Sequence, residues 1–152
     1  YGAESRELLH YAALLTDIGA YINRSSRHKH AQYIINHSQM RGFSSRELLL
    51  LSSIVRYHRK SQPSKEHMHY NLLAGTEKGM VWLLGGMLRL AKNLDRAQRG
   101  VVTGLSVHPA KKKLQLQILS NDALKIERKS AEEEKEMLEN ALGRAVELSV
   151  NT

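Results

Sequence analysis

The apolar residues of this chain change their spacing near Gly100, and that change constrains the fold class. Before Gly100, apolar side chains recur every three or four residues, as on one face of an α-helix. After it, apolar and polar residues alternate, as in a half-buried β-strand. We therefore expect a mainly α protein, with a helical bundle over residues 1–100 followed by a small α+β subdomain over residues 101–152.

The predicted bundle contains five helices, of which the third has the clearest signals. Ser44 and Glu47 have the spacing of a capping box, which opens this helix. From Leu48 to Val55 the helix is apolar on nearly all sides, so we expect it at the buried centre of the bundle. The other predicted helices cover approximately residues 4–18, 27–40, 65–73 and 76–98.

The last fifty residues predict a hairpin, a third strand, a helix and a final strand. Two alternating segments flank a turn at residues 108–111, which predicts the hairpin. Leu124 and Ile126 predict the third strand. A second capping box at residues 130–133 opens a helix that ends at Gly143, and the apolar residues over 146–150 predict the final strand.

The positive charge lies in the predicted bundle. The chain has 23 Lys and Arg against 15 Asp and Glu, which gives a net charge of +8 at pH 7. Residues 101–152 are balanced, so the whole excess lies in residues 1–100. Such an excess favours a polyanionic partner, such as nucleic acid, a phosphorylated metabolite or a membrane surface, although a basic face that only aids solubility is an alternative.

The composition also bounds the compartment and the class of protein. The chain has no cysteine, which excludes disulfides and thiolate metal sites and makes the cytoplasm the expected compartment. The longest apolar run, Met80–Leu84, is far shorter than the ~20 residues of a membrane-spanning helix, so we expect no membrane partner. Because the sequence begins with Tyr1 rather than Met, we expect it to be processed or cut from a longer chain.

Basic residues gather near predicted helix ends between Leu14 and Lys60. The predicted central helix emerges in a basic segment, and loops at such positions often carry functional residues. Arg offers a planar fork to phosphate oxygens and Lys a mobile charge. As an alternative, Arg59 and Lys60 cap the carbonyl groups of their own helix. The candidate anion-binding residues are Arg27, His28, Lys29, His30, Arg56, His58, Arg59, Lys60 and Lys92.

Four ordered blocks resemble the C-terminal region of the Ppx/GppA family, the exopolyphosphatases and guanosine pentaphosphate phosphohydrolases. The blocks are AALLTDIG, KHAQYIINHSQMRGFS, IVRYHRK and LRLAKNLDR. The resemblance extends over nearly the whole chain, including the predicted strands. It implies an HD-like accessory module that binds polyphosphate and forms homodimers, within an enzyme that releases the terminal phosphate of polyphosphate or of guanosine pentaphosphate (pppGpp).

The same resemblance places the chemistry outside this chain. In the family, an N-terminal pair of actin-like domains supplies phosphate-binding loops, a catalytic carboxylate and magnesium, and the 152 residues contain no such motif. The resemblance therefore implies no catalytic residue and no cofactor in this chain, which we expect to be inactive alone. The implied partners are polyphosphate or pppGpp, a second copy, and its own N-terminal catalytic domain if the chain is longer. The sequence leaves the choice between the two substrates open.

The segment Leu14–Gly19 also resembles the LLHDIG core of the HD phosphohydrolases, in which two His and two Asp residues bind divalent metals. Here Thr16 stands in place of the paired His, and Lys92 in place of the later Asp. Neither side chain replaces an imidazole or a carboxylate as a ligand of a hard cation. We therefore expect no metal and interpret Thr16 and Asp17 as a degenerate remnant.

Two other functions remain open at this point. One is an active metal-dependent HD phosphohydrolase, with Asp17 and histidines as metal ligands. The other is a basic nucleic-acid-binding module. The second is less favoured because the basic cluster lacks interleaved aromatic residues for base stacking, with Tyr57 as the one candidate.

Overall fold

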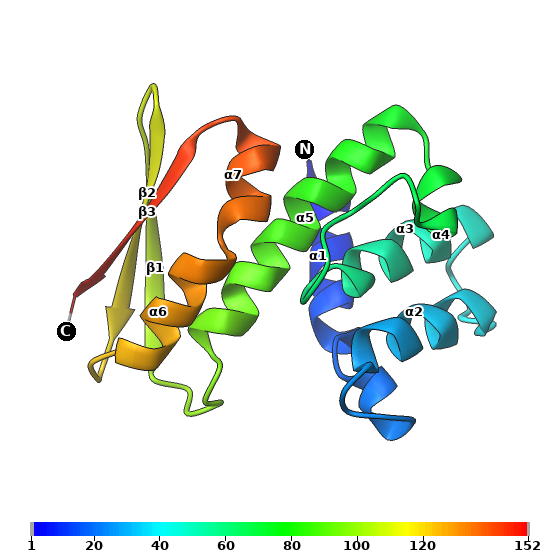
Figure 1. The fold of residues 1–152 in the computed structure, drawn as a ribbon, viewed down its shortest axis with the longest axis horizontal. Coiled ribbons are helices and arrows are strands. Elements are labelled where there is room, and N and C mark those ends of the chain that lie inside the picture. Colours follow the sequence, from blue (N-terminus) through cyan, green and yellow to red (C-terminus); the bar gives the residue numbers. More distant parts are fainter. Residues whose placement is uncertain (1, 152) are drawn as a thin grey trace. The chain divides into compact units, whose positions relative to one another are not determined.

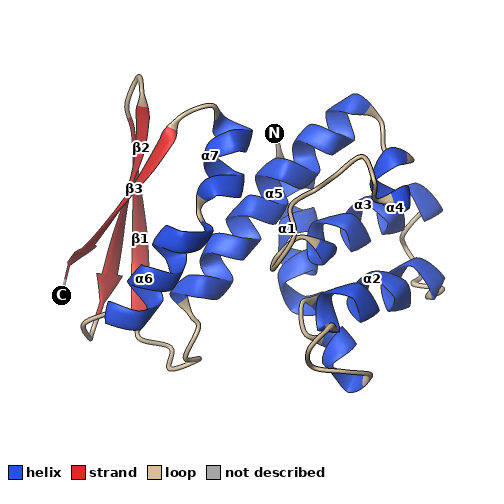
Figure 2. Cartoon of the chain, viewed as in Figure 1, coloured by secondary structure: helices blue, strands red, loops and turns tan. Residues whose placement is uncertain are grey.

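The computed structural model of the protein describes residues 2–151, which form two compact units. The first unit extends to Leu88 and the second begins at Arg89. Helices build the first unit, whereas the second combines helices with a three-stranded sheet (Figure 1, Figure 2). The predicted mainly α fold with an α+β end is confirmed. The domain boundary that the sequence predicts near residue 100 stays a prediction.

The helices of the first unit are shorter than their apolar patterns predict. Helices α1 and α2 both end beside a residue whose hydroxyl donates to a carbonyl oxygen three residues earlier, Thr16 to Ala13 (3.0 Å) and Ser38 to Ile35 (2.8 Å). Such local bonds compete with the next turn of a helix. The elements are α1 (Ala3–Leu15), the 3-10 helix η1 (Ile18–Tyr21), α2 (Arg27–His37), α3 (Ser45–Arg56), α4 (Met68–Asn71) and α5 (Gly75–Leu94), whose last turns belong to the second unit.

Helix α3 lies at the centre of the first unit, as predicted. The Glu47 backbone N–H donates to the Ser44 hydroxyl (3.2 Å), and the Ser44 backbone N–H donates to the Glu47 carboxylate (2.7 Å), which confirms the capping box. Every residue from Leu50 to His58 is buried. Because α3 packs against both α1 and α2, it has no solvent-facing side over this stretch.

Gly19 allows η1 to lie directly against α2. A Cβ atom at Gly19 would overlap the carbonyl oxygen of Arg27 and the backbone nitrogen of Ala31. Both of these atoms belong to backbone in the first turns of α2, so neither can move aside as a flexible side chain would. Glycine is therefore required on steric grounds at this joint.

The second unit places α6 (Lys125–Glu134) and α7 (Glu136–Leu142) on one face of its sheet (Figure 1). Strand β1 (Val102–Pro109) pairs antiparallel with β2 (Lys113–Ser120), which confirms the predicted hairpin. Strand β3 (Ala145–Asn151) is also confirmed and pairs parallel with β2. A parallel neighbour needs a crossover connection, and α6 and α7 provide it.

Two details predicted for this unit are wrong. Leu124 and Ile126 form no strand, because α6 begins at Lys125. Ser130 opens no helix either; it lies inside α6, where its hydroxyl donates to the Asn93 side-chain oxygen (2.7 Å). A two-residue alternation is too short to distinguish a strand from a helix. The predicted helix end at Gly143 is confirmed, with φ +63° at the C-cap of α7.

Among residues 2–151, no helix combines the length and the apolar character that crossing a bilayer would require.

Candidate anion-binding site

Five of the basic candidates meet where the end of α3 approaches the start of α2. Burial, followed by the charges of Arg56 and Arg59, lowers the pKa of His28 to about 3, and His58 and Lys60 act in the same direction. These groups therefore lie near His28, which is neutral at pH 7. The set His28, Arg56, His58, Arg59 and Lys60 is called the Arg56 cluster below.

Buried nitrogen atoms of this cluster lack a hydrogen-bond partner among the described residues. They include Nδ1 of His28, whose residue is 2% exposed, and Nη1 of Arg56, whose residue is 8% exposed. A buried polar group without a partner costs about 1–3 kcal/mol, and more when it is charged. Native proteins rarely leave such groups unsatisfied without a bound ion, ligand or water. A further hydrogen-bonding group, whether water or a ligand, would satisfy both atoms.

The charge of Arg56 is not neutralised by a carboxylate within the described part of the chain. Burial lowers the pKa of its guanidinium, and the group that opposes this effect is the Tyr57 phenol. The Arg56 guanidinium carbon lies 5.7 Å from the centroid of the Tyr57 ring, a cation–π contact. An aromatic face stabilises the cation but provides no charge to balance it, so the site retains a buried positive charge.

Tyr57 and His67 extend the site beyond the cluster. The Tyr57 hydroxyl lies 2.8 Å from Nδ1 of His67. Burial, then the charge of Arg56, lowers the pKa of His67 below its ordinary value of 6.5, and Lys29 acts in the same direction. Burial also raises the pKa of Tyr57 to about 12, so its phenol keeps its proton at pH 7. His67 was missed by sequence reasoning, because it lies in a loop with no motif around it.

The turn that follows α3 is strained and tied to the segment before α2. Lys60 has φ +62°, in the left-handed region. This conformation costs a residue other than glycine roughly 1–2 kcal/mol, and strained turns often occur at functional sites. Nη1 of Arg59 donates to the Arg24 carbonyl oxygen at 3.4 Å. The alternative function of Arg59 and Lys60, capping their own helix, stays a prediction.

Four predicted residues are not part of the cluster, and one of them, Lys29, acts on His67 instead. His30 lies two residues after His28 on α2, so its side chain points to nearly the opposite side of the helix. Nε of Arg27 lies 3.1 Å from the Asp17 carboxylate, which compensates its charge. Lys92 belongs to the second unit, and its part in the site stays a prediction.

Thr16 and Asp17, the predicted remnant of a metal site, make structural contacts at the joint between α1 and α2. Thr16 is 2% exposed and its hydroxyl bonds back to α1. Asp17 precedes η1 and pairs with Arg27. In the part of the chain that the structure describes, no three His, Asp or Glu side chains are arranged to hold a metal ion. The residues present therefore do not fit a magnesium site.

Comparison with known families agrees with the sequence blocks. The family model described as "Ppx/GppA phosphatase, domain III" matches residues 2–144. The matched range includes the whole of the first unit that the structure describes and most of the second, so the similarity is not confined to one motif.

Proposed function

Because the chain belongs to the Ppx/GppA phosphatase family, we propose that it is an accessory module of such a phosphatase and that the Arg56 cluster binds phosphate groups of its substrate. The substrate is polyphosphate or pppGpp, from which the complete enzyme releases the terminal phosphate. The catalytic residues lie outside these 152 residues, so the isolated module hydrolyses neither compound. The absence of cysteine favours the cytoplasm as its compartment.

The observation that carries this proposal is the buried guanidinium of Arg56. It has an Nη1 atom without a partner and no neutralising carboxylate among the described residues. A phosphate oxygen would satisfy both needs, because it accepts a hydrogen bond and carries negative charge. Charge-assisted hydrogen bonds of this kind contribute about 1.5–3 kcal/mol, more than bonds between neutral groups.

The rest of the cluster suits a chain of phosphates. Arg59 and Lys60 add two positive charges beside Arg56, while neutral His28 adds a nitrogen that can form a hydrogen bond. Lys29 and His67 continue the site on the side of Tyr57. By analogy with single-stranded nucleic acids, the logarithm of the affinity should fall with the logarithm of salt concentration, with a slope of about −0.7 per phosphate neutralised.

Arg56→Met tests the proposal, with Arg41→Met as the matched control because Arg41 is an exposed arginine outside the cluster. We expect Arg56→Met to weaken the binding of long-chain polyphosphate about 10- to 100-fold, as expected for one lost charge-assisted bond. Arg41→Met should change it less than about twofold. Isothermal calorimetry at fixed salt measures both, and thermal melting verifies folding. Wild-type affinity in a folded Arg56→Met variant would disprove the proposed site. Repeating the titration with pppGpp separates the two substrates.

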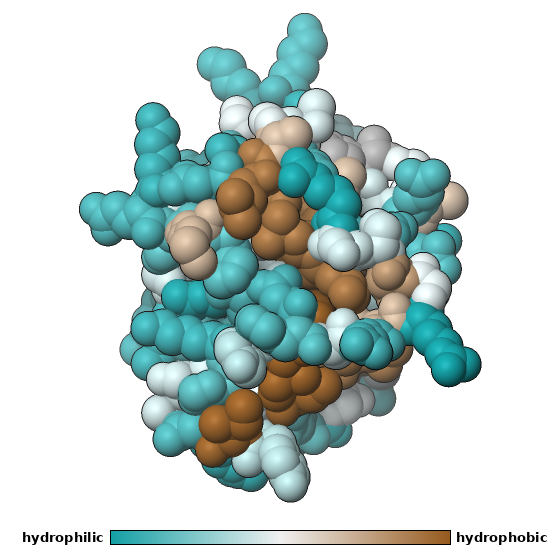
Figure 3. Space-filling model, turned by 90° about the vertical axis from the view of Figure 1, so that its right-hand side faces the viewer, coloured by the Kyte–Doolittle hydropathy of each residue, from teal (hydrophilic) through white to brown (hydrophobic). Residues whose placement is uncertain are grey.

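We also propose that two copies of the module associate through the surface around η1. Leu14, Ile18, Tyr21 and Ile22 are all exposed within nine residues, and Tyr21 is 96% exposed. Apolar surface also emerges between hydrophilic areas on the face drawn in Figure 3. Exposed apolar patches often mark interfaces, and two-fold dimers are the commonest assembly. Sedimentation should show a dimer that Ile22→Glu dissociates and the control Ile126→Glu, in the second unit, does not; a monomeric wild type at high micromolar concentration would contradict this.

A further inference from the structure

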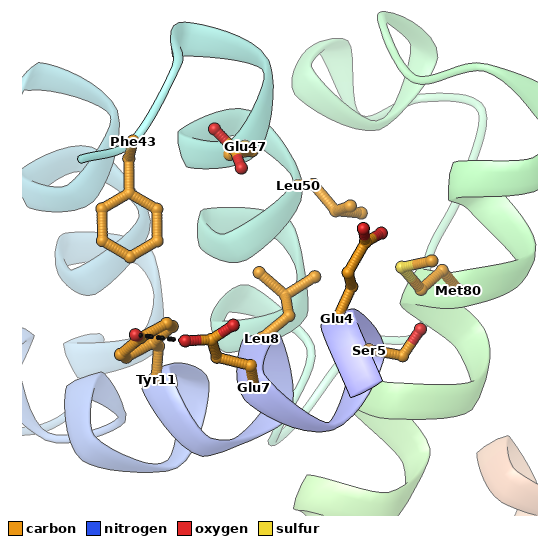
Figure 4. A pocket seen from close by; sticks show the side chains of 9 residues that line it. All are labelled: Glu4, Ser5, Glu7, Leu8, Tyr11, Phe43, Glu47, Leu50 and Met80. Atoms are coloured by element: carbon orange, nitrogen blue, oxygen red, sulfur yellow. Dashed lines mark hydrogen bonds between the residues drawn. The ribbon is translucent and has the colours of Figure 1, made fainter. Parts of the chain in front are cut away.

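A second candidate site, unrelated to the Arg56 cluster, lies in the first unit between α1, α3 and α5. It is a half-open pocket of about 250 Å³. Its lining combines carboxylates and apolar side chains, among them Glu4, Glu7, Glu47, Leu8, Phe43 and Met80 (Figure 4). The pocket and the cluster share no residue. A negatively charged pocket is unexpected in a chain whose net charge is +8.

The carboxylates of the pocket are held in place by their own elements. Glu4 and Glu7 lie three residues apart on α1 and therefore on one face of that helix. Glu47 belongs to the capping box of α3, where the Ser44 hydroxyl lies 2.6 Å from its carboxylate and lowers the pKa of that group. The Tyr11 hydroxyl donates to Glu7 at 2.8 Å, and this bond raises the pKa of the Tyr11 phenol. The negative charges thus face one space from two helices.

The remaining lining residues are aromatic and aliphatic and lie among the carboxylates (Figure 4). The rings of Tyr11 and Phe43 pack edge to face, with centroids 5.2 Å apart. Leu8, Leu50 and Met80 supply the remaining apolar surface (Figure 4). Aromatic faces attract cations, and they do so more strongly where water is partly excluded. The pocket therefore offers an apolar surface to the body of a ligand and negative charge to its head.

Ser5 adds a hydroxyl group to the lining of the pocket. The residue is 7% exposed, and Figure 4 shows its hydroxyl pointing toward Met80. A hydroxyl can both donate and accept a hydrogen bond, so it suits the polar head of a ligand.

We infer that this pocket binds a small organic cation, with a primary ammonium or guanidinium group on an apolar body. Its volume is just below the roughly 300–1,000 Å³ of pockets for drug-sized ligands, which limits the ligand to a small molecule. A bare metal ion fits poorly, since about half the lining is apolar and residues 2–151 contain no three side chains arranged as metal ligands. An anion would be repelled by Glu4, Glu7 and Glu47.

The test uses benzylamine as the cationic probe and benzyl alcohol as its neutral counterpart of similar shape. Two-dimensional NMR titration of the wild-type protein should give saturable shifts at Ser5, Tyr11 and Phe43 with benzylamine. The affinity for benzyl alcohol should be at least about tenfold weaker, because it makes the apolar contacts without the charge. Equal affinity for the two probes, or no saturable shift at these residues, would overturn the inference.

A double variant identifies the carboxylates that act. Glu4→Gln/Glu7→Gln keeps the size of both side chains, and the amide oxygen at position 7 can still accept the Tyr11 hydrogen bond. We expect it to bind benzylamine about tenfold more weakly than the wild type. Glu66→Gln, at an exposed residue outside the pocket, should bind benzylamine normally. Wild-type affinity in the folded double variant, or an equal loss in Glu66→Gln, would refute the assignment.

Discussion

Two arginines, one in each unit, are buried to a similar extent but are compensated differently. Arg56 in the first unit is 8% exposed and Arg89 in the second is 3% exposed. Burial lowers the pKa of both guanidinium groups. For Arg89 the charges of Glu134 and Glu136 act against this effect, and Nε lies 3.5 Å from the Glu134 carboxylate. For Arg56 the opposing group is the neutral Tyr57 phenol.

The difference separates a charge that is balanced by carboxylates from one that has no carboxylate partner among the described residues. Arg89 joins α5 to α6, and Asn93, one turn further along α5, accepts a hydrogen bond from Ser130 of α6 (2.7 Å). These contacts hold the second unit together. The buried charge of Arg56 instead opposes folding, since an ion removed from water costs several kcal/mol unless it is paired. Under the proposed function, a bound phosphate would supply the missing charge.

The largest loss of stability is expected for a change at the contact between η1 and α2, which keeps the cluster together. Gly19→Ala should destabilise the protein by about 3 kcal/mol or more, because its Cβ would overlap backbone atoms of α2 and displace His28 from Arg56. The control is Gly143→Ala in the second unit, where φ is +63° but the space around a Cβ is open. That variant should lose only about 1 kcal/mol. Urea denaturation compares them, and equal losses would contradict the steric argument.

His28 should make the first unit sensitive to acid. Its pKa is about 3 when folded and near 6.5 when unfolded, so between these values the unfolded chain binds more protons. The free energy of unfolding has its full value above pH 6.5 and decreases as the pH is lowered toward 3. At pH 5 the decrease is about 2 kcal/mol. Bound polyphosphate should reduce this loss, because a nearby anion favours the protonated imidazole.

The pH dependence of unfolding in urea measures the effect, with and without polyphosphate. His28→Gln should remove most of the loss between pH 6.5 and pH 5, since an amide does not titrate in this range. The control is His10→Gln, because His10 is exposed on α1 and lies outside the cluster. An unchanged pH dependence in His28→Gln would show that other groups account for the acid sensitivity.

Local patterns predicted the parts of the fold that depend on neighbouring residues. The capping box of α3, its burial and the hairpin were correct because each is specified within a few residues of sequence. The first part of α6, before Ser130, was not predicted as helix, because the buried face of α6 is mostly polar. It contains Glu127, which pairs with Arg99 at 3.3 Å, and Ser130, which bonds to Asn93. Such partners come from distant sequence and leave no apolar period in the helix itself.

The same limit applies to the candidate site. The basic end of α3 was visible in the sequence, as was the start of α2. Tertiary packing determines which side of α2 faces α3. This packing brings His28 into the cluster and directs His30 away from it. The pairing of Arg27 with Asp17 and the approach of His67 to Tyr57 also depend on the folded arrangement. Composition alone treats all these residues as equivalent.

The last prediction is that the loss of a charge near Arg89 and the loss of the Arg56 charge affect the free energy of unfolding differently. Glu134→Gln removes one of the two carboxylates that act on Arg89. It should lower the free energy of unfolding by about 1 kcal/mol, a small value because Glu134 is 38% exposed and Glu136 remains. Arg56→Met removes a buried charge that has no carboxylate, so the free energy of unfolding should stay within about 0.5 kcal/mol of wild type or rise. Urea denaturation without phosphate in the buffer measures both. A loss of about 2 kcal/mol or more in Arg56→Met would mean that the guanidinium stabilises the fold, and the two buried arginines would then serve the same structural purpose.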